Sequence, residues 1–209
     1  MGFGLLIYGY LMMIDFGVST IAEYNIGFDV FPDIVGYIIF FTALKKLSRH
    51  ASGFRIAKYL SIPLIVLGAV KLAAEGFSFF GKYGSVISSV LDACEWAKLT
   101  LFVIFNLFLL SGVRSLAARV ELPKTVKRST GAMIINLLYF IMKVSVYAFP
   151  FAEGERYFMI LSFSLTWYLL VFFTIFVMFN CYMYICYEGD ENIMIPESRL
   201  TKLLKKIKK

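Results

Sequence analysis

Eight ionisable side chains lie inside apolar segments of this 209-residue chain or at the ends of such segments. They are Asp15, Asp33, Lys71, Glu75, Asp92, Glu95, Lys98 and Lys143. An ionisable side chain in a membrane span is costly unless it is paired or hydrated, so each is a candidate for binding an ion, a proton or a small solute. A carboxyl group in apolar surroundings is also a candidate general acid or base.

The segments that carry these charges indicate an integral membrane protein. Hydrophobic residues make up 60% of the chain and the mean hydropathy is +0.77, whereas soluble domains are roughly 45–50% apolar. Six apolar segments are close to the length that crosses a bilayer, at approximately 2–20, 30–48, 56–80, 86–112, 131–149 and 157–187. The sequence predicts an all-α fold, a six-transmembrane-helix bundle over residues 1–187, with a tail at 188–209.

Lysine and arginine gather on one side of this predicted bundle. Most of the 21 basic residues fall in the loop after the second helix, in the loop after the fourth helix and in the tail. By the positive-inside rule, both termini are cytoplasmic and the chain is a multi-pass protein of the cell membrane. Since a helix rises about 1.5 Å per residue, the eight ionisable groups then lie in the outer half of the bilayer.

Charges from five helices at similar depth are expected to face one another or a hydrated pocket that opens to the outside. We expect an apolar plug below this pocket, formed by residues 101–110 and 172–179. Either Asp15 or Glu95 is the expected partner of Lys143. Five acids against three bases would leave excess negative charge, which predicts protonated carboxyls or a bound cation. The predicted ligand- or ion-binding residues are Asp15, Glu95, Lys98, Lys143, Lys71 and Glu75.

Structural roles remain open for several of these charges. Asp33 follows Pro32, and a proline at the first helical position with an acid in the first turn is a common helix start. Asp92 is shallow enough to be an interfacial residue. Lys71 and Glu75 are four residues apart and can pair on one helix face. Aromatic residues at the same depth form either an interfacial belt or a wall for an organic cation: Tyr37, Trp96, Tyr147, Trp167 and Tyr168.

The tail has the pattern of an amphipathic basic helix. Leucine and isoleucine recur at 200, 203, 204 and 207, which predicts a helix on the cytoplasmic surface in contact with anionic lipid. Its membrane-surface residues are Arg199, Lys202, Lys205, Lys206, Lys208 and Lys209. A disordered basic end that reinforces the topology is the alternative, and a cytoplasmic partner protein is a further option. Nucleic acid is not an expected partner, because membrane orientation already explains the net charge of +7.

Several chemistries lack the residues they need. His50 is the only histidine and lies in a predicted cytoplasmic loop, so imidazole metal sites and catalytic triads inside the bundle are not expected. The sequence contains no glycine-rich phosphate loop and no H-E-x-x-H pattern. We therefore expect no catalytic residue, no metal and no cofactor in this chain.

Three functions fit these observations. The first is a small-solute or ion binding or transport subunit. In helix number and length the expected topology resembles the S-components of energy-coupling-factor vitamin transporters, without their small-x-x-x-small pair in the first helix. The second is a scaffold, immunity or signalling subunit, assembled with a partner membrane subunit, in which buried charges specify helix packing. The third is a membrane enzyme that uses an outer carboxylate, and it has the least support because nothing resembling a nucleophile set accompanies the acids.

Overall fold

The computed structural model describes residues 2–14, 33–79, 85–148 and 153–185, and this part of the chain contains six helices and no strand. The helices are α1 (Gly2–Met12), α2 (Asp33–Leu47), α3 (Ser52–Phe79), α4 (Ser85–Arg119), α5 (Pro123–Ala148) and α6 (Glu153–Tyr184). Three stretches are long and apolar enough to cross a membrane: Ser52–Ala74, Leu91–Arg119 and Leu161–Tyr184. The fold is all-helical, and these three stretches indicate a membrane protein.

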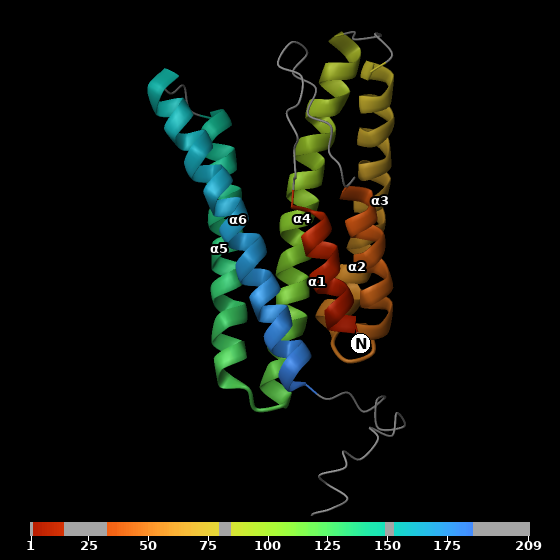
Figure 1. Cartoon of the computed structure of the whole chain (residues 1–209), viewed down its shortest axis with the longest axis vertical. Helices are drawn as coiled ribbons and strands as arrows, with labels where there is room; N and C mark the ends of the chain where they lie inside the picture. The colour runs from red at the N-terminus through yellow and green to blue at the C-terminus, as the bar shows by residue number, and fades with distance from the viewer. Residues whose placement is uncertain (1, 15–32, 80–84, 149–152, 186–209) are drawn as a thin grey trace, which may run out of the picture.

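The helices form one bundle in which neighbours in sequence are neighbours in space. Each helix packs against the next one along the chain, and α1 also packs against α6. Figure 1 shows α5 and α6 lying together. They diverge from α3 and α4 at the end of the bundle where α3 finishes and α4 begins. Helix α1 fills the space between α2 and α6 near the opposite end.

Aromatic rings fill the core of the bundle. Phe3, Tyr10, Phe40, Phe54 and Phe105 are fully buried. The Phe40 ring lies 4.8 Å from the Tyr10 ring and 5.2 Å from the Phe105 ring, measured between centroids. Lipid chains are as apolar as these rings, so moving the rings from lipid into the core gains little free energy. Close van der Waals contact among the rings therefore stabilises this core. The rings thereby fix α1, α2 and α4 against one another.

A glycine contact brings α3 and α4 together. A Cβ atom added to Gly53 would lie 2.5 Å from the carbonyl oxygen of Phe108 and 2.6 Å from the backbone nitrogen of Gly112. Those atoms belong to the helix backbone, so they cannot move aside as a flexible side chain would. Small residues at such crossings allow membrane helices to approach closely.

The connection between α4 and α5 is a tight turn, not the long loop that the hydropathy pattern predicts. Helix α4 continues past residue 112 to Arg119, and α5 begins at Pro123. The Leu122 amide donates to the Ala117 carbonyl (2.9 Å), and Glu121 has a positive φ of 55°, which together form a Schellman helix end. Hydropathy locates the apolar part of a helix, and basic residues can extend the same helix beyond the hydrocarbon.

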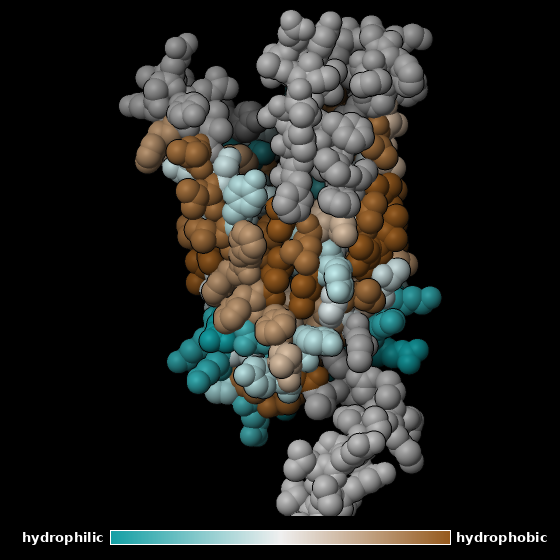
Figure 2. All heavy atoms as spheres, in the orientation of Figure 1, coloured by the Kyte–Doolittle hydropathy of each residue, from teal (hydrophilic) through white to brown (hydrophobic). Residues whose placement is uncertain are grey.

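Basic side chains gather at the end of the bundle that holds this turn and the α2–α3 connection. Arg119 Nη1 donates to the carbonyl of His50 (3.1 Å), and Arg128 Nη1 donates to Asn180 Oδ1 (3.1 Å). Figure 2 shows hydrophilic surface at this end and apolar surface along the helices above it. The exposed basic residues here are Lys45, Lys46, Arg49, Arg55, Arg114, Arg119, Lys124 and Lys127.

Candidate functional site

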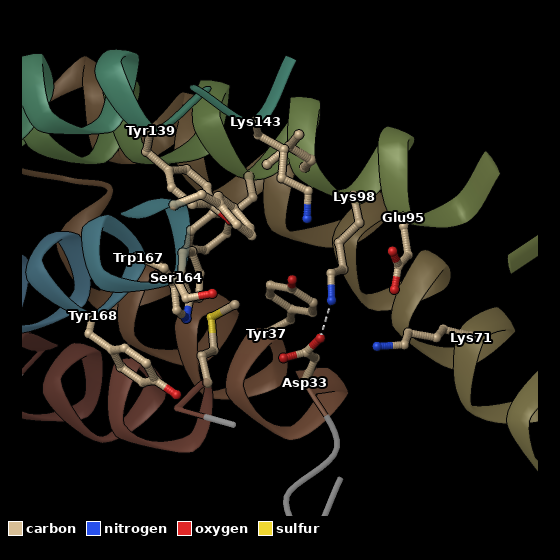
Figure 3. Close-up of a pocket in the computed structure, with 14 residues that line it drawn as sticks. Asp33, Tyr37, Lys71, Glu95, Lys98, Tyr139, Lys143, Ser164, Trp167 and Tyr168 are labelled. Carbon is tan, nitrogen blue, oxygen red and sulfur yellow. Dashed lines mark hydrogen bonds and ion pairs between the residues drawn. The ribbon is translucent and has the colours of Figure 1, made fainter. Parts of the chain in front are cut away.

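A cavity of about 310 Å³ lies away from the basic end of the bundle. Asp33 at the start of α2 lines it, whereas Lys45 and Lys46 close the same helix at the basic end. Helices α2, α3, α4, α5 and α6 all contribute side chains, and Met13 reaches it from the residues after α1. The lining residues are Met13, Asp33, Tyr37, Lys71, Glu95, Lys98, Leu99, Phe102, Tyr139, Lys143, Phe163, Ser164, Trp167 and Tyr168, most of them labelled in Figure 3.

An ion pair between α2 and α4 forms one wall of the cavity. The ammonium group of Lys98 donates to the carboxylate of Asp33. The Asp33 side chain is 9% exposed and the Lys98 side chain 24%. A carboxylate this deeply buried is stable only with a partner. Asp33 also lies in the first turn of α2, where the helix dipole favours an acid, so one residue both starts the helix and joins it to α4.

Lys71 and Glu95 extend the charged wall. In Figure 3 the Lys71 ammonium group points toward the space beside Asp33 and Glu95, and Glu95 points into the same region from α4. Glu95 and Lys98 are three residues apart on one helix, which places them on the same face. The charged side of the cavity is therefore built from α2, α3 and α4.

The opposite wall is aromatic and comes largely from α5 and α6. The Tyr139 ring lies 5.3 Å from the Phe163 ring and 5.2 Å from the Trp167 ring. Lys143 Nζ lies over the Phe163 ring, 4.5 Å from its centre, which is a favourable cation–π distance. Lys143 therefore brings a positive charge to the border between the aromatic wall and the charged wall (Figure 3).

A buried hydrogen-bond chain lies one helical turn below the cavity. The Tyr10 hydroxyl donates to Asn106 Oδ1, Asn106 Nδ2 donates to Asn136 Oδ1 (3.4 Å), and Asn136 Nδ2 donates to the Val103 carbonyl (2.9 Å). All three side chains are buried. The chain joins α1, α4 and α5, so the predicted plug at 101–110 is not purely apolar. A search for formal charges overlooks these residues, although buried asparagines in apolar helices are themselves a signal of interhelical contact.

The structure brings four predicted site residues to one cavity: Lys71, Glu95, Lys98 and Lys143. Other lining residues, among them Asp33, Tyr139 and Ser164, were not predicted as site residues from the sequence. Asp15 and the tail 188–209 lie outside the described residues, as does the side chain of Glu75. Asp92 is exposed, as an interfacial residue would be. An ion pair at this cavity joins Lys98 to Asp33. The pairing of Lys143 with Asp15 or Glu95 stays a prediction.

Within the described part of the chain, no group of three or more histidine, cysteine, aspartate or glutamate side chains is placed to hold a metal ion. The cavity therefore offers ammonium groups, carboxylates, hydroxyls and aromatic faces as its binding groups. Comparison of the chain with protein-family models, with curated proteins and with solved structures found no match.

Proposed function

We propose that this chain is a multi-pass protein of the cell membrane that crosses the bilayer six times, with both termini on the cytoplasmic side. The basic end of the bundle supports this orientation by the positive-inside rule. Helices α1, α2 and α5 each pack alongside one of the three long apolar helices, as further spans of the same bundle would. The tail 188–209 would lie on the cytoplasmic surface against anionic lipid.

In this orientation the cavity faces the outside, and the chain acts as a small-solute binding or transport subunit. The observation that carries this proposal is the convergence of charged and aromatic side chains from five helices on one cavity. If the buried charges served only to pair the helices, they would need ion-pair partners but no cavity beside them. A volume of about 310 Å³ lies at the lower end of the roughly 300–1,000 Å³ typical of small-molecule sites, so the expected ligand is small.

Filling the cavity tests this proposal. We expect native mass spectrometry of the protein in lipid nanodiscs to detect a reproducible small molecule, and the Ser164→Trp variant to lose it because the indole would occupy the lined volume. The matched control is Leu165→Trp, because Leu165 is the next residue of α6 and its side chain is 57% exposed. Either a wild-type protein that carries no small molecule, or a Ser164→Trp variant that retains it, would contradict the proposal.

A second function is favoured by the Asp33–Lys98 ion pair itself, because it joins α2 to α4. In a scaffold, immunity or signalling subunit, this pair would specify helix packing, and a membrane subunit or a cytoplasmic protein would be the partner. The charge-swapped variant Asp33→Lys/Lys98→Asp separates the two functions. A scaffold would recover its fold and its partner, whereas a binding site would recover its fold without its ligand.

A further inference from the structure

Helix α5 holds a guanidinium group in a fixed position near the basic end of the bundle. Arg128 Nη1 donates to Asn180 Oδ1 (3.1 Å), and Asn180 Nδ2 donates to the Phe176 carbonyl (2.7 Å). The guanidinium carbon of Arg128 also lies 4.7 Å from the centre of the Phe176 ring, which is a favourable cation–π distance. Contacts with two residues of α6 therefore fix the position of this cation.

The Arg128 guanidinium has the hydrogen-bonding capacity to hold a ligand as well. It carries five N–H donors in a planar fork that matches the oxygen atoms of a phosphate, and Asn180 accepts from only one of its nitrogens. Arg128 is partly buried, and salt screens a partly buried charge less than an exposed one. A phosphate group is therefore a suitable ligand for the outward side of this guanidinium.

The Phe176 ring that contacts this guanidinium belongs to an exposed apolar face of α6. Phe172, Phe176, Phe179 and Met183 follow one another at intervals of four, three and four residues, so they share one helix face, and all four are exposed. Helix α6 contains a stretch long enough to cross a membrane, and an exposed apolar face of such a helix is a membrane contact. Arg128 thus brings a positive charge to the edge of a lipid-facing surface.

A second cation lies at the basic end of the exposed face of α5. Lys127, Ile134, Leu138 and Ile141 recur at intervals of seven, four and three residues, so they share one face, and all four are exposed. Lys127 and Arg128 are consecutive and therefore differ in height by only about 1.5 Å. Figure 2 shows hydrophilic surface where α5 begins and apolar surface on the helices above it.

We propose that Lys127 and Arg128 bind the phosphate of an anionic phospholipid, whose acyl chains lie along the exposed apolar faces of α5 and α6. Basic groups beside membrane helices recognise anionic head groups in this way. Phosphatidylcholine fits less well, because its choline would bring a third cation next to the two side chains. The inference needs only a membrane-embedded bundle, so it does not depend on the solute-binding function or on the proposed orientation.

Quenching of tryptophan fluorescence by brominated lipid measures which lipid lies beside a chosen position. Phe172→Trp is the reporter for the proposed site, because Phe172 is one turn from Phe176 on the same face of α6. Ile62→Trp is the control reporter, since Ile62 is an exposed residue of the long apolar helix α3. Each full-length variant is placed in vesicles of phosphatidylcholine and phosphatidylglycerol, with bromine on the acyl chains of either lipid. The quenching of the chain without the added tryptophan is subtracted.

We expect Phe172→Trp to report a preference for phosphatidylglycerol over phosphatidylcholine that is at least about fivefold stronger than at Ile62→Trp. A factor of about five is the effect of one basic residue near an anionic lipid. Basic residues elsewhere, including those of the tail, attract anionic lipid to the protein as a whole and would raise quenching at both reporters. Equal preferences at the two reporters would therefore overturn the inference.

Substitutions in the Phe172→Trp chain test the assigned head-group contacts. Arg128→Gln should reduce the preference to that of Ile62→Trp, whereas the control Lys46→Gln, which removes an exposed lysine at the basic end, should leave it unchanged. A preference that survives Arg128→Gln, or that falls equally in Lys46→Gln, would overturn the inference. Lys127→Gln leaves the Asn180 contact in place and should weaken the preference severalfold, so it decides the question where Arg128→Gln does not fold; an unchanged preference in Lys127→Gln would then overturn it.

Discussion

Removing Lys98 is expected to destabilise the protein more than removing the charge of its partner Asp33. In the Lys98→Met variant the Asp33 carboxylate, whose side chain is 9% exposed, stays buried without its cation. Breaking a fully buried ion pair from one side costs roughly 3–5 kcal/mol, and exposed pairs are worth about 0.2–1 kcal/mol. Because the Lys98 side chain is 24% exposed, we expect a loss of about 2–3 kcal/mol in the free energy of unfolding.

Asp33→Asn is expected to cost less, about 1 kcal/mol, because the amide oxygen still accepts a hydrogen bond and the more exposed Lys98 ammonium can be hydrated. The double variant Asp33→Asn/Lys98→Met buries no unpaired charge and should also lose about 1 kcal/mol. The two substitutions should therefore be non-additive by roughly 2–3 kcal/mol, as expected for residues in direct contact.

Reversible unfolding in mixed micelles of dodecyl maltoside and dodecyl sulfate measures this cycle, with tryptophan fluorescence as the signal. Trp167 lines the cavity and therefore reports on this part of the bundle. Lys124→Met serves as the control for loss of an exposed lysine and should change the unfolding free energy by less than about 0.5 kcal/mol. Additive single variants, or a larger loss in Asp33→Asn than in Lys98→Met, would refute the reasoning.

Three other substitutions test the framework that holds the cavity. Tyr10→Phe removes the hydroxyl that donates to Asn106, and should lower the unfolding free energy by about 0.6–1.7 kcal/mol; an unchanged stability would contradict the hydrogen-bond chain. Gly53→Ala should destabilise by more than about 2 kcal/mol, because its Cβ would meet the α4 backbone at 2.5 Å. Gly131→Ala is its control, since that Cβ would lie 3.6 Å from a ring, and equal unfolding midpoints of the two variants would count against a close helix crossing. Glu121→Gly should stabilise by up to about 1 kcal/mol, because glycine adopts the positive φ of 55° without the strain of a side chain; a lower midpoint in the same unfolding assay would argue against strain at this turn.

Helix locations could be predicted from the sequence, and helix ends could not. The three long apolar helices lie within the predicted segments 56–80, 86–112 and 157–187 or overlap them closely, because hydropathy reports the transfer free energy of each residue by itself. The end of α4 at Arg119 depends instead on backbone hydrogen bonds and on the turn at Glu121. Hydropathy carries no information about either.

The candidate site was accessible to sequence reasoning only in part. Charges in apolar segments identified Lys71, Glu95, Lys98 and Lys143, because such residues are rare in membrane helices. Asp33 was assigned to the helix start by its local sequence, and nothing local indicates the lysine 65 residues away that pairs with it. Ser164, an uncharged lining residue, gives no comparable signal.

The sequence by itself determined the class of the protein, the apolar segments and the separation of basic residues from the charges within those segments. These properties follow from the solvation of individual residues and from their order along the chain. Only the tertiary structure decided which charges meet, because the rotation and pairing of helices depend on packing among side chains distant in sequence. It joined Asp33 to Lys98 and set an aromatic wall opposite them.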